Sequence, residues 1–235
     1  MIDTKGYEVL FEKKSDPQVD LGHGYVNRYR TRRVDAGPMR YIEVYPVLRA
    51  WEGAGRAREK RRASREAQRR LNEKNARKKI EWLFNENFCE RDVFATFTFA
   101  REVEEGEARD AVRKLIRRAR AYAKRDTSGR SGEIKYIYVI EGRVGADETE
   151  RFHIHMVISG IGRDALEGMW EYGRANTRRL QPDENQYTGL AKYMTKQRRF
   201  ARRWSCSKNL RRPREWVADH KISKRKVERL AAEAR

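Results

Sequence analysis

Cysteine is scarce in this sequence of 235 residues: only Cys89 and Cys206 are present, far apart in the chain. They are too few and too distant for a disulfide framework or a cysteine zinc site, so we expect two reduced thiols. No apolar run approaches the roughly 18 residues of a membrane span. Residues 1–20 also lack the apolar core of a secretory signal. The sequence therefore predicts a soluble, intracellular protein.

Acidic residues are too few to balance the basic ones. The chain has 35 Asp and Glu against 55 Lys and Arg, a formal net charge of +20, with 38% apolar and 10% aromatic residues. That apolar content suffices for a core and argues against a wholly disordered chain. The charge predicts a polyanionic partner, with nucleic acid and an acidic membrane surface as the candidates.

The excess charge is concentrated in two segments. Residues 55–80 hold 12 Lys and Arg against 3 Glu, and residues 197–235 hold 14 Lys and Arg against 4 acids. The rest of the chain has 29 basic and 28 acidic residues, so it is almost neutral. This distribution predicts a neutral globular body with two basic arms.

Both arms suit contact with phosphates. The first arm, Ala57 to Ile80, lacks Pro and Gly and predicts a helix, which is either solvated or bound to DNA; its lopsided charge favours phosphate contact. In the second arm Phe200 and Trp204 alternate with arginine pairs, a composition that either holds phosphates and stacks bases or anchors the tail to the core. The proposed DNA-binding residues of the arms are Arg61, Arg62, Arg69, Arg70, Arg198, Arg199, Arg202, Arg203, Trp204, Arg211 and Arg212.

The remaining pattern predicts an α+β fold. The expected elements are strands 25–34, 39–47, 93–99, 134–141, 151–159 and 174–180, and helices 105–125, 164–172 and 182–197. Their order indicates an antiparallel β-sheet with flanking helices. We expect four segments: an N-terminal β element (1–54), a basic helical segment (55–91), a catalytic domain (92–197) and a basic C-terminal tail (198–235).

One expected strand carries two histidines on the same face. Side chains two apart in a strand share a face, so His153 and His155 point away from the apolar layer of Phe152, Ile154 and Met156. Two imidazoles so placed form a plausible pair of metal ligands. Glu141 ends the neighbouring strand and completes a candidate set suited to Mg²⁺ or Mn²⁺, with Glu148 and Glu150 as competitors in the loop.

The last expected helix contributes Tyr193. Tyr187, Leu190, Ala191 and Met194 share its core face, whereas Tyr193 falls outside that face, on the side of Gly189 and Lys196, where we expect open space. A tyrosyl oxygen can attack a phosphate that a metal polarises. An ordinary surface tyrosine is the alternative in the absence of the histidines.

Together these residues resemble three motifs, in order, of the HUH endonucleases. The motifs are Phe94-Ala-Thr-Phe-Thr-Phe99, then Glu141 with Phe152-His-Ile-His-Met-Val-Ile158, then Ala191-Lys-Tyr-Met-Thr-Lys196. More narrowly, the chain over about 70–213 is similar to rolling-circle replication initiators (Rep proteins) of bacterial plasmids and single-stranded DNA phages.

The resemblance implies a mechanism. Glu141, His153 and His155 would bind Mn²⁺ or Mg²⁺ at the scissile phosphate of single-stranded origin DNA, and Tyr193 would attack it. The products would be a 5′-phosphotyrosine and a free 3′-hydroxyl, with later rejoining of strands. Lys196, or Lys192 in its place, would stabilise charge. No phosphate loop of a helicase occurs, so a separate helicase and the host replication machinery of a bacterial cytoplasm are the expected partners.

The sequence departs from the two-tyrosine pattern of phage initiators, because position 189, four before Tyr193, is glycine. We therefore expect a single-tyrosine enzyme and leave its termination step open. A mobilisation relaxase or a single-tyrosine transposase is an alternative, although common relaxases place the tyrosine before the histidines. A non-catalytic DNA-binding regulator is the alternative from another class; membrane binding is disfavoured, because the arms lack a large apolar face.

Overall fold

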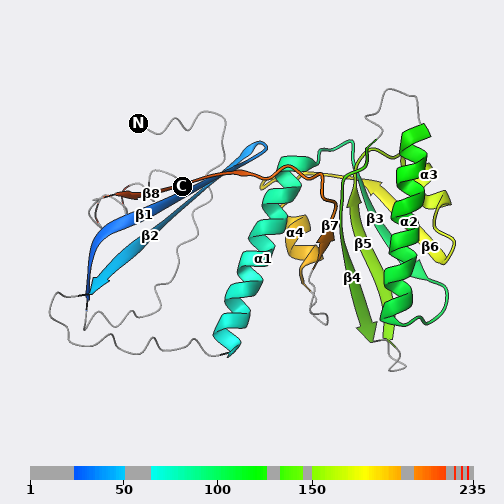
Figure 1. Cartoon of the computed structure of the whole chain (residues 1–235), viewed down its shortest axis with the longest axis horizontal. Coiled ribbons are helices and arrows are strands. Elements are labelled where there is room, and N and C mark those ends of the chain that lie inside the picture. Colours follow the sequence, from blue (N-terminus) through cyan, green and yellow to red (C-terminus); the bar gives the residue numbers. More distant parts are fainter. Residues whose placement is uncertain are drawn as a thin grey trace. The chain divides into compact units, whose positions relative to one another are not determined.

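The computed structural model describes residues 24–50, 65–125, 133–144, 150–196 and 204–220, with Arg225, Arg229 and Ala232 (Figure 1). The described residues fall into two compact units. One unit is Lys74–Arg211, and the other combines residues from Met1–Glu73 and Arg212–Arg235. Among the described residues, no helix is long and apolar enough to cross a membrane.

The unit Lys74–Arg211 is built on an antiparallel sheet with the strand order β6-β3-β5-β4-β7. The strands are β3 (Val93–Phe99), β4 (Tyr136–Val144), β5 (Glu150–Ile158), β6 (Gly173–Arg179) and β7 (Ser205–Cys206). The helices are α1 (Arg65–Asn87), α2 (Glu105–Arg125), α3 (Arg163–Gly168) and α4 (Thr188–Met194). This architecture confirms the predicted α+β fold.

Helix α2 covers one face of the sheet (Figure 1). Its buried positions recur at helical spacing and include Val112, Leu115 and Ile116, so the helix presents one apolar stripe. This stripe packs with Ile154 and Met156 of β5 in one core cluster. The helix has the bounds that its periodicity predicts.

Helices α1 and α4 contribute to a second core, on the opposite face. Ile80, Leu83 and Phe84 of α1 and Ala191 and Met194 of α4 belong to this cluster. The sheet contributes residues that alternate with those of the first core, namely Phe94, Ile137, Val139 and Val157. Each of the three central strands is therefore apolar on both sides over most of its length.

The other unit contains a three-stranded antiparallel sheet, β2-β1-β8. Strands β1 (Gly24–Ala36) and β2 (Met39–Ala50) form the predicted hairpin around Gly37, whose φ of 56° suits a residue without a side chain. Strand β8 (Arg214–His220) pairs with β1.

Two predicted helices are shorter in the structure. The helix predicted over 182–197 begins only at Thr188, because Asp183 and Gln186 exchange backbone hydrogen bonds in a tight turn and Gln186 has a φ of 56°. A residue in that region of φ interrupts a right-handed helix. Helix α3 ends at Gly168 rather than at Tyr172.

The segment boundaries predicted from motifs differ from the compact units. Strand β7 joins the sheet that carries the histidines, and β8 joins the N-terminal sheet, although both fall in the predicted tail 198–235. Helix α1 begins at Arg65, and the predicted helical residues 57–64 lie outside the described part of the chain. Both tail strands are short and pair with distant strands, which local sequence patterns do not reveal.

Candidate functional site

The two histidines of β5 lie on the sheet face that α4 covers. Ile154 and Met156 belong to the α2 core, so His153 and His155 point to the opposite side, together with Val157. His155 is 4% exposed and His153 is half-buried. The shared face predicted from alternation is therefore present.

Glu141 lies on the same face of the neighbouring strand. In the register of β4 and β5 it is directly opposite His153, and its Oε2 lies 2.8 Å from Nε2 of His155. Among the described residues, no group of three or more His, Cys, Asp and Glu side chains is already arranged to hold a metal. The donor set, two imidazole nitrogens and a carboxylate on one face, still fits a divalent cation chemically.

Two threonines of β3 orient the histidine rings. Oγ1 of Thr96 lies 3.1 Å from Nδ1 of His155, and Oγ1 of Thr98 lies 3.2 Å from Nδ1 of His153. These contacts engage the Nδ1 atoms, so Nε2 is the nitrogen that each ring offers to a ligand. Neither threonine was predicted from the sequence; the signal was a pair of polar residues at alternate positions in an otherwise apolar strand.

Replacing Thr96 by valine should weaken the divalent-metal dependence of the site. The T96V change removes the hydroxyl that orients His155 and keeps the side-chain shape, and losses of this kind reduce metal affinity or activity by about 10- to 100-fold. The measurement is a Mn²⁺ titration followed by thermal stability and by DNA nicking. T96S, which keeps the hydroxyl, should behave like the unaltered protein. A T96V titration identical to that of the unaltered protein would contradict the orienting role.

Tyr193 lies beside His155. The centroids of the two rings are 5.0 Å apart at an interplanar angle of 70°, and the Tyr193 ring also meets Phe94 edge-on at 6.1 Å. Phe94 in turn is stacked parallel to His155, with centroids 6.0 Å apart. Tyr193 remains 43% exposed, as its helical position predicts. The fold therefore brings an accessible phenol to the edge of the candidate ligand set.

Tyr187 cannot share this role. It is 4% exposed and belongs to the core, and burial raises its pKa to about 12. Contrary to the expectation from sequence, the space beside Gly189 is not open. A Cβ atom at that position would lie 2.6 Å from Oδ2 of Asp183, so a larger side chain requires Asp183 to move.

Two lysines flank Tyr193. Lys192 precedes it in α4, and Lys196 follows the end of the helix; both are exposed. Each is therefore available to a charged substrate, and their geometry does not favour one over the other.

A row of polar residues on β6 shares the histidine face. Arg174, Asn176 and Arg178 are opposite Thr98, Thr96 and Phe94 in the register with β3, and all three are exposed. The guanidinium carbon of Arg178 lies 5.0 Å from the centroid of the Phe94 ring. This row was not predicted from the sequence, because its position beside the histidines depends on strand order; alternation in the strand was the available signal.

The proposed DNA-binding residues of the arms are only partly described. Arg61, Arg62, Arg198, Arg199, Arg202 and Arg203, with Phe200, lie outside the described residues. Arg69 and Arg70 are exposed and pair with Glu73 and Glu66 within α1, and Arg211 and Arg212 are exposed. Trp204 packs partly buried against the α1 and α4 core, which favours the anchoring alternative for its ring.

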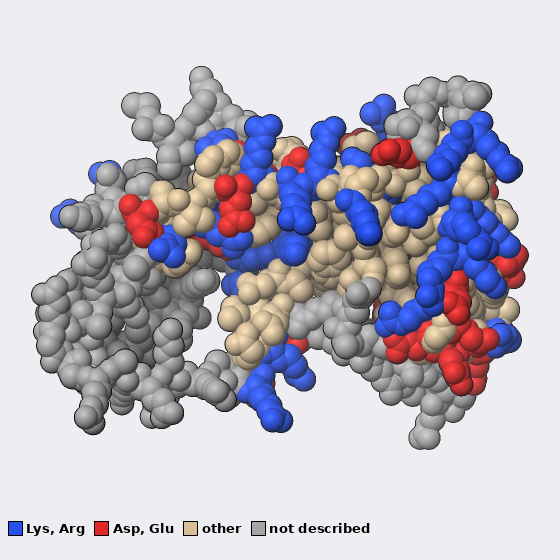
Figure 2. All heavy atoms as spheres, in the orientation of Figure 1, with Lys and Arg blue, Asp and Glu red and all other residues tan. Residues whose placement is uncertain are grey.

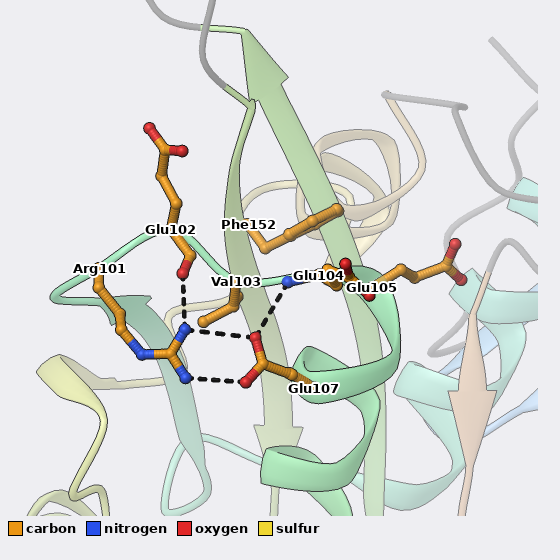
Figure 3. Close-up of a pocket in the computed structure, with 7 residues that line it drawn as sticks. All are labelled: Arg101, Glu102, Val103, Glu104, Glu105, Glu107 and Phe152. Atoms are coloured by element: carbon orange, nitrogen blue, oxygen red, sulfur yellow. Dashed lines mark hydrogen bonds and ion pairs between the residues drawn. The ribbon is translucent and has the colours of Figure 1, made fainter.

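An acidic hollow of about 600 Å³ lies at the start of α2, next to Phe152 (Figure 3). Its carboxylates have structural partners: Glu107 accepts hydrogen bonds from the guanidinium of Arg101, at 2.8 and 3.3 Å, and from the backbone N–H of Glu104. The Arg101 hydrogen bond lowers the pKa of Glu107. These contacts order the loop before α2 and account for Glu107 without a metal.

Residues 92–198 match the family model of the replication-associated protein ORF2 and gene 2 protein, a family of phage replication initiators. No curated protein and no solved structure matches the chain. The matched segment extends from β3 through α4, and so includes Glu141, His153, His155 and Tyr193.

Proposed function

We propose, with the match to phage replication initiators as the premise, that this chain is a single-tyrosine rolling-circle replication initiator. It nicks single-stranded origin DNA through Tyr193 and later rejoins strands. The observation that carries the proposal is the position of Tyr193, whose exposed ring lies 5.0 Å from the ring of His155, which in turn contacts Glu141.

Glu141, His153 and His155 would hold a divalent cation, Mg²⁺ or Mn²⁺. Such a cation supplies positive charge to an oxygen of the scissile phosphate and so makes the phosphorus easier to attack. Thr96 and Thr98 support this role, because they fix the two imidazoles through Nδ1. The contact between Glu141 and His155 keeps the carboxylate at the same edge.

The reaction exchanges one phosphodiester oxygen for another. The phenolic oxygen of Tyr193 forms a bond to phosphorus and gives up its proton, while the bond from phosphorus to the 3′-oxygen breaks and that oxygen takes a proton. The products are a 5′-phosphotyrosine and a 3′-hydroxyl, and reversal with a new 3′-hydroxyl rejoins the strand. Lys192 and Lys196 are exposed beside Tyr193 and would stabilise the charge that develops on the phosphate.

The row on β6 gives the single strand a path to Tyr193. Alternate residues of a strand are about 7 Å apart, comparable to successive phosphates of an extended single strand. Arg174 and Arg178 would each contact a phosphate, and Asn176 between them is a hydrogen-bonding group. Arg178 is nearest to the reacting groups, because it lies over Phe94, which stacks on His155.

Replacing Arg178 by glutamine should weaken binding of single-stranded DNA in a salt-dependent way. Each lost phosphate contact lowers the slope of log affinity against log salt by roughly 0.7 for a single strand. The measurement is fluorescence anisotropy over a salt series without divalent metal. R179Q is the matched control, because Arg179 is the next residue of the same strand, faces the opposite side and donates to the carbonyl of Arg91. Equal slopes for R178Q and R179Q would exclude the path along β6.

The function itself is tested with a library of single-stranded DNA and Mn²⁺. After incubation and denaturation, DNA that remains covalently attached is recovered and sequenced. The proposal predicts attachment through a 5′ end with one preferred cleavage sequence. Binding without covalent attachment would contradict it and would support a non-catalytic DNA-binding regulator.

A further inference from the structure

The charge of α2 is segregated along its length. Glu105, Glu107 and Asp110 all lie near its start, whereas residues 111–125 contain seven Lys and Arg and no acid. In Figure 2 basic side chains cover this part of the molecule above a cluster of acidic ones. The near neutrality of residues 81–196 as a whole therefore conceals a strongly basic surface on the side of the sheet opposite Tyr193.

Part of this basic surface is a groove between α2 and β4. Arg113, Arg117, Arg120 and Lys124 follow one another at intervals of four, three and four residues, so they form one line along the helix, about 16 Å long. Tyr136 and Tyr138 of β4 line the other side. The groove has a volume of about 470 Å³.

The four cations differ in how far they are already engaged. Arg113 pairs with Asp110, and Arg120 lies over the ring of Tyr136 at 5.7 Å, with Nη2 3.5 Å from the phenolic oxygen. Among the described residues, neither Arg117 nor Lys124 has a carboxylate within ion-pair distance, and both are exposed. These two side chains are therefore the ones most available to an external anion.

The tyrosines of the groove do not offer a surface for stacked bases. Tyr136 is only 9% exposed, and Arg120 covers its ring. Burial also raises the pKa of Tyr136, so its phenol stays neutral and does not repel an anion. Single-stranded nucleic acid is typically held by exposed rings as well as cations, whereas duplex DNA is held mainly through its phosphates.

We infer that this groove binds the sugar–phosphate backbone of duplex DNA, at a site separate from the one that holds the nicked strand. The five-stranded sheet lies between α2 and the histidine face, so the two DNA segments contact opposite sides of the domain. The acidic start of α2 repels phosphates and limits the duplex site to the second half of the helix. The inference rests on the proposed function only in taking the polyanion to be DNA.

The test compares two double variants of the full chain that remove the same charge. R117Q/K124Q neutralises the two available cations, and R101Q/R109Q neutralises two arginines that pair with Glu107 and Glu105 near the start of α2. Binding of a short fluorescent duplex of random sequence is measured over a salt series without divalent metal. R117Q/K124Q should lower the log–log slope by roughly 1.8, about 0.9 for each lost contact, and R101Q/R109Q should lower it far less.

Two results would overturn the duplex site. One is an equal slope for both double variants; the other is a loss confined to a single strand of the same length. Nicking of a short single-stranded oligonucleotide with Mn²⁺ is measured in parallel and should be the same for R117Q/K124Q and the unaltered chain. If the unaltered chain does not nick at all, the proposed enzymatic function fails, while the duplex-binding comparison remains a complete test of the groove.

Discussion

Tyr193→Phe is expected to abolish the covalent protein–DNA adduct. The change removes only the phenolic oxygen, which is the proposed nucleophile, and keeps the ring that contacts His155 and Phe94. Loss of a nucleophile typically costs on the order of a thousand-fold or more in rate. The measurement is adduct formation on a single-stranded oligonucleotide selected from the library, resolved by denaturing gel electrophoresis.

Tyr122→Phe is the matched control for that variant. Tyr122 is 42% exposed, almost the same as Tyr193, but it lies on α2, on the other side of the sheet. Its adduct yield should equal that of the unaltered chain. Adduct formation by Y193F at the level of Y122F would remove Tyr193 from the role of nucleophile.

The second large effect is expected when both histidines are replaced. The variant His153→Ala with His155→Ala removes both imidazoles of the proposed ligand set and should abolish Mn²⁺-dependent nicking. Binding of single-stranded DNA should remain largely intact, since the cations of β6 are unchanged. Nicking and anisotropy measured on the same preparation separate the two effects.

Because the ring of His155 is buried, the double variant needs a partner that preserves packing. Glu141→Gln keeps nearly the same size and removes the carboxylate charge that contacts His155. It should also lose Mn²⁺-dependent nicking while its melting temperature stays close to that of the unaltered chain. Full activity in a folded E141Q protein would remove Glu141 from the ligand set, and full activity of the double variant would remove the metal proposal.

Much of the fold was predictable where a local period decides the structure. The apolar spacing of residues 105–125 gave the bounds of α2, and the dense β-branched and aromatic run gave β3. Alternation in β5 placed His153 and His155 on one face before the strand order was known. Tyr193 was separable from Tyr187 by helical angle alone, although the helix itself proved shorter.

What the sequence did not show depends on pairing between distant strands. Thr96 and Arg178 join the site only because β3 lies between β5 and β6, an order that no local pattern specifies. Strands β7 and β8 were missed for the same reason. Charge counted by segment also concealed the basic half of α2, since acids and bases near one another in sequence separate along the helix.

The most direct test of the central claim is to locate the nucleotide on the protein. The chain is incubated with a selected single-stranded oligonucleotide and Mn²⁺, the DNA is trimmed with a nuclease, and the digested protein is examined by mass spectrometry. We predict a nucleotide remnant, joined through its 5′-phosphate, on the peptide that contains Tyr193. A remnant on any other residue, or an efficiently cleaved oligonucleotide with no remnant on the protein, would contradict the assignment of Tyr193 as the nucleophile.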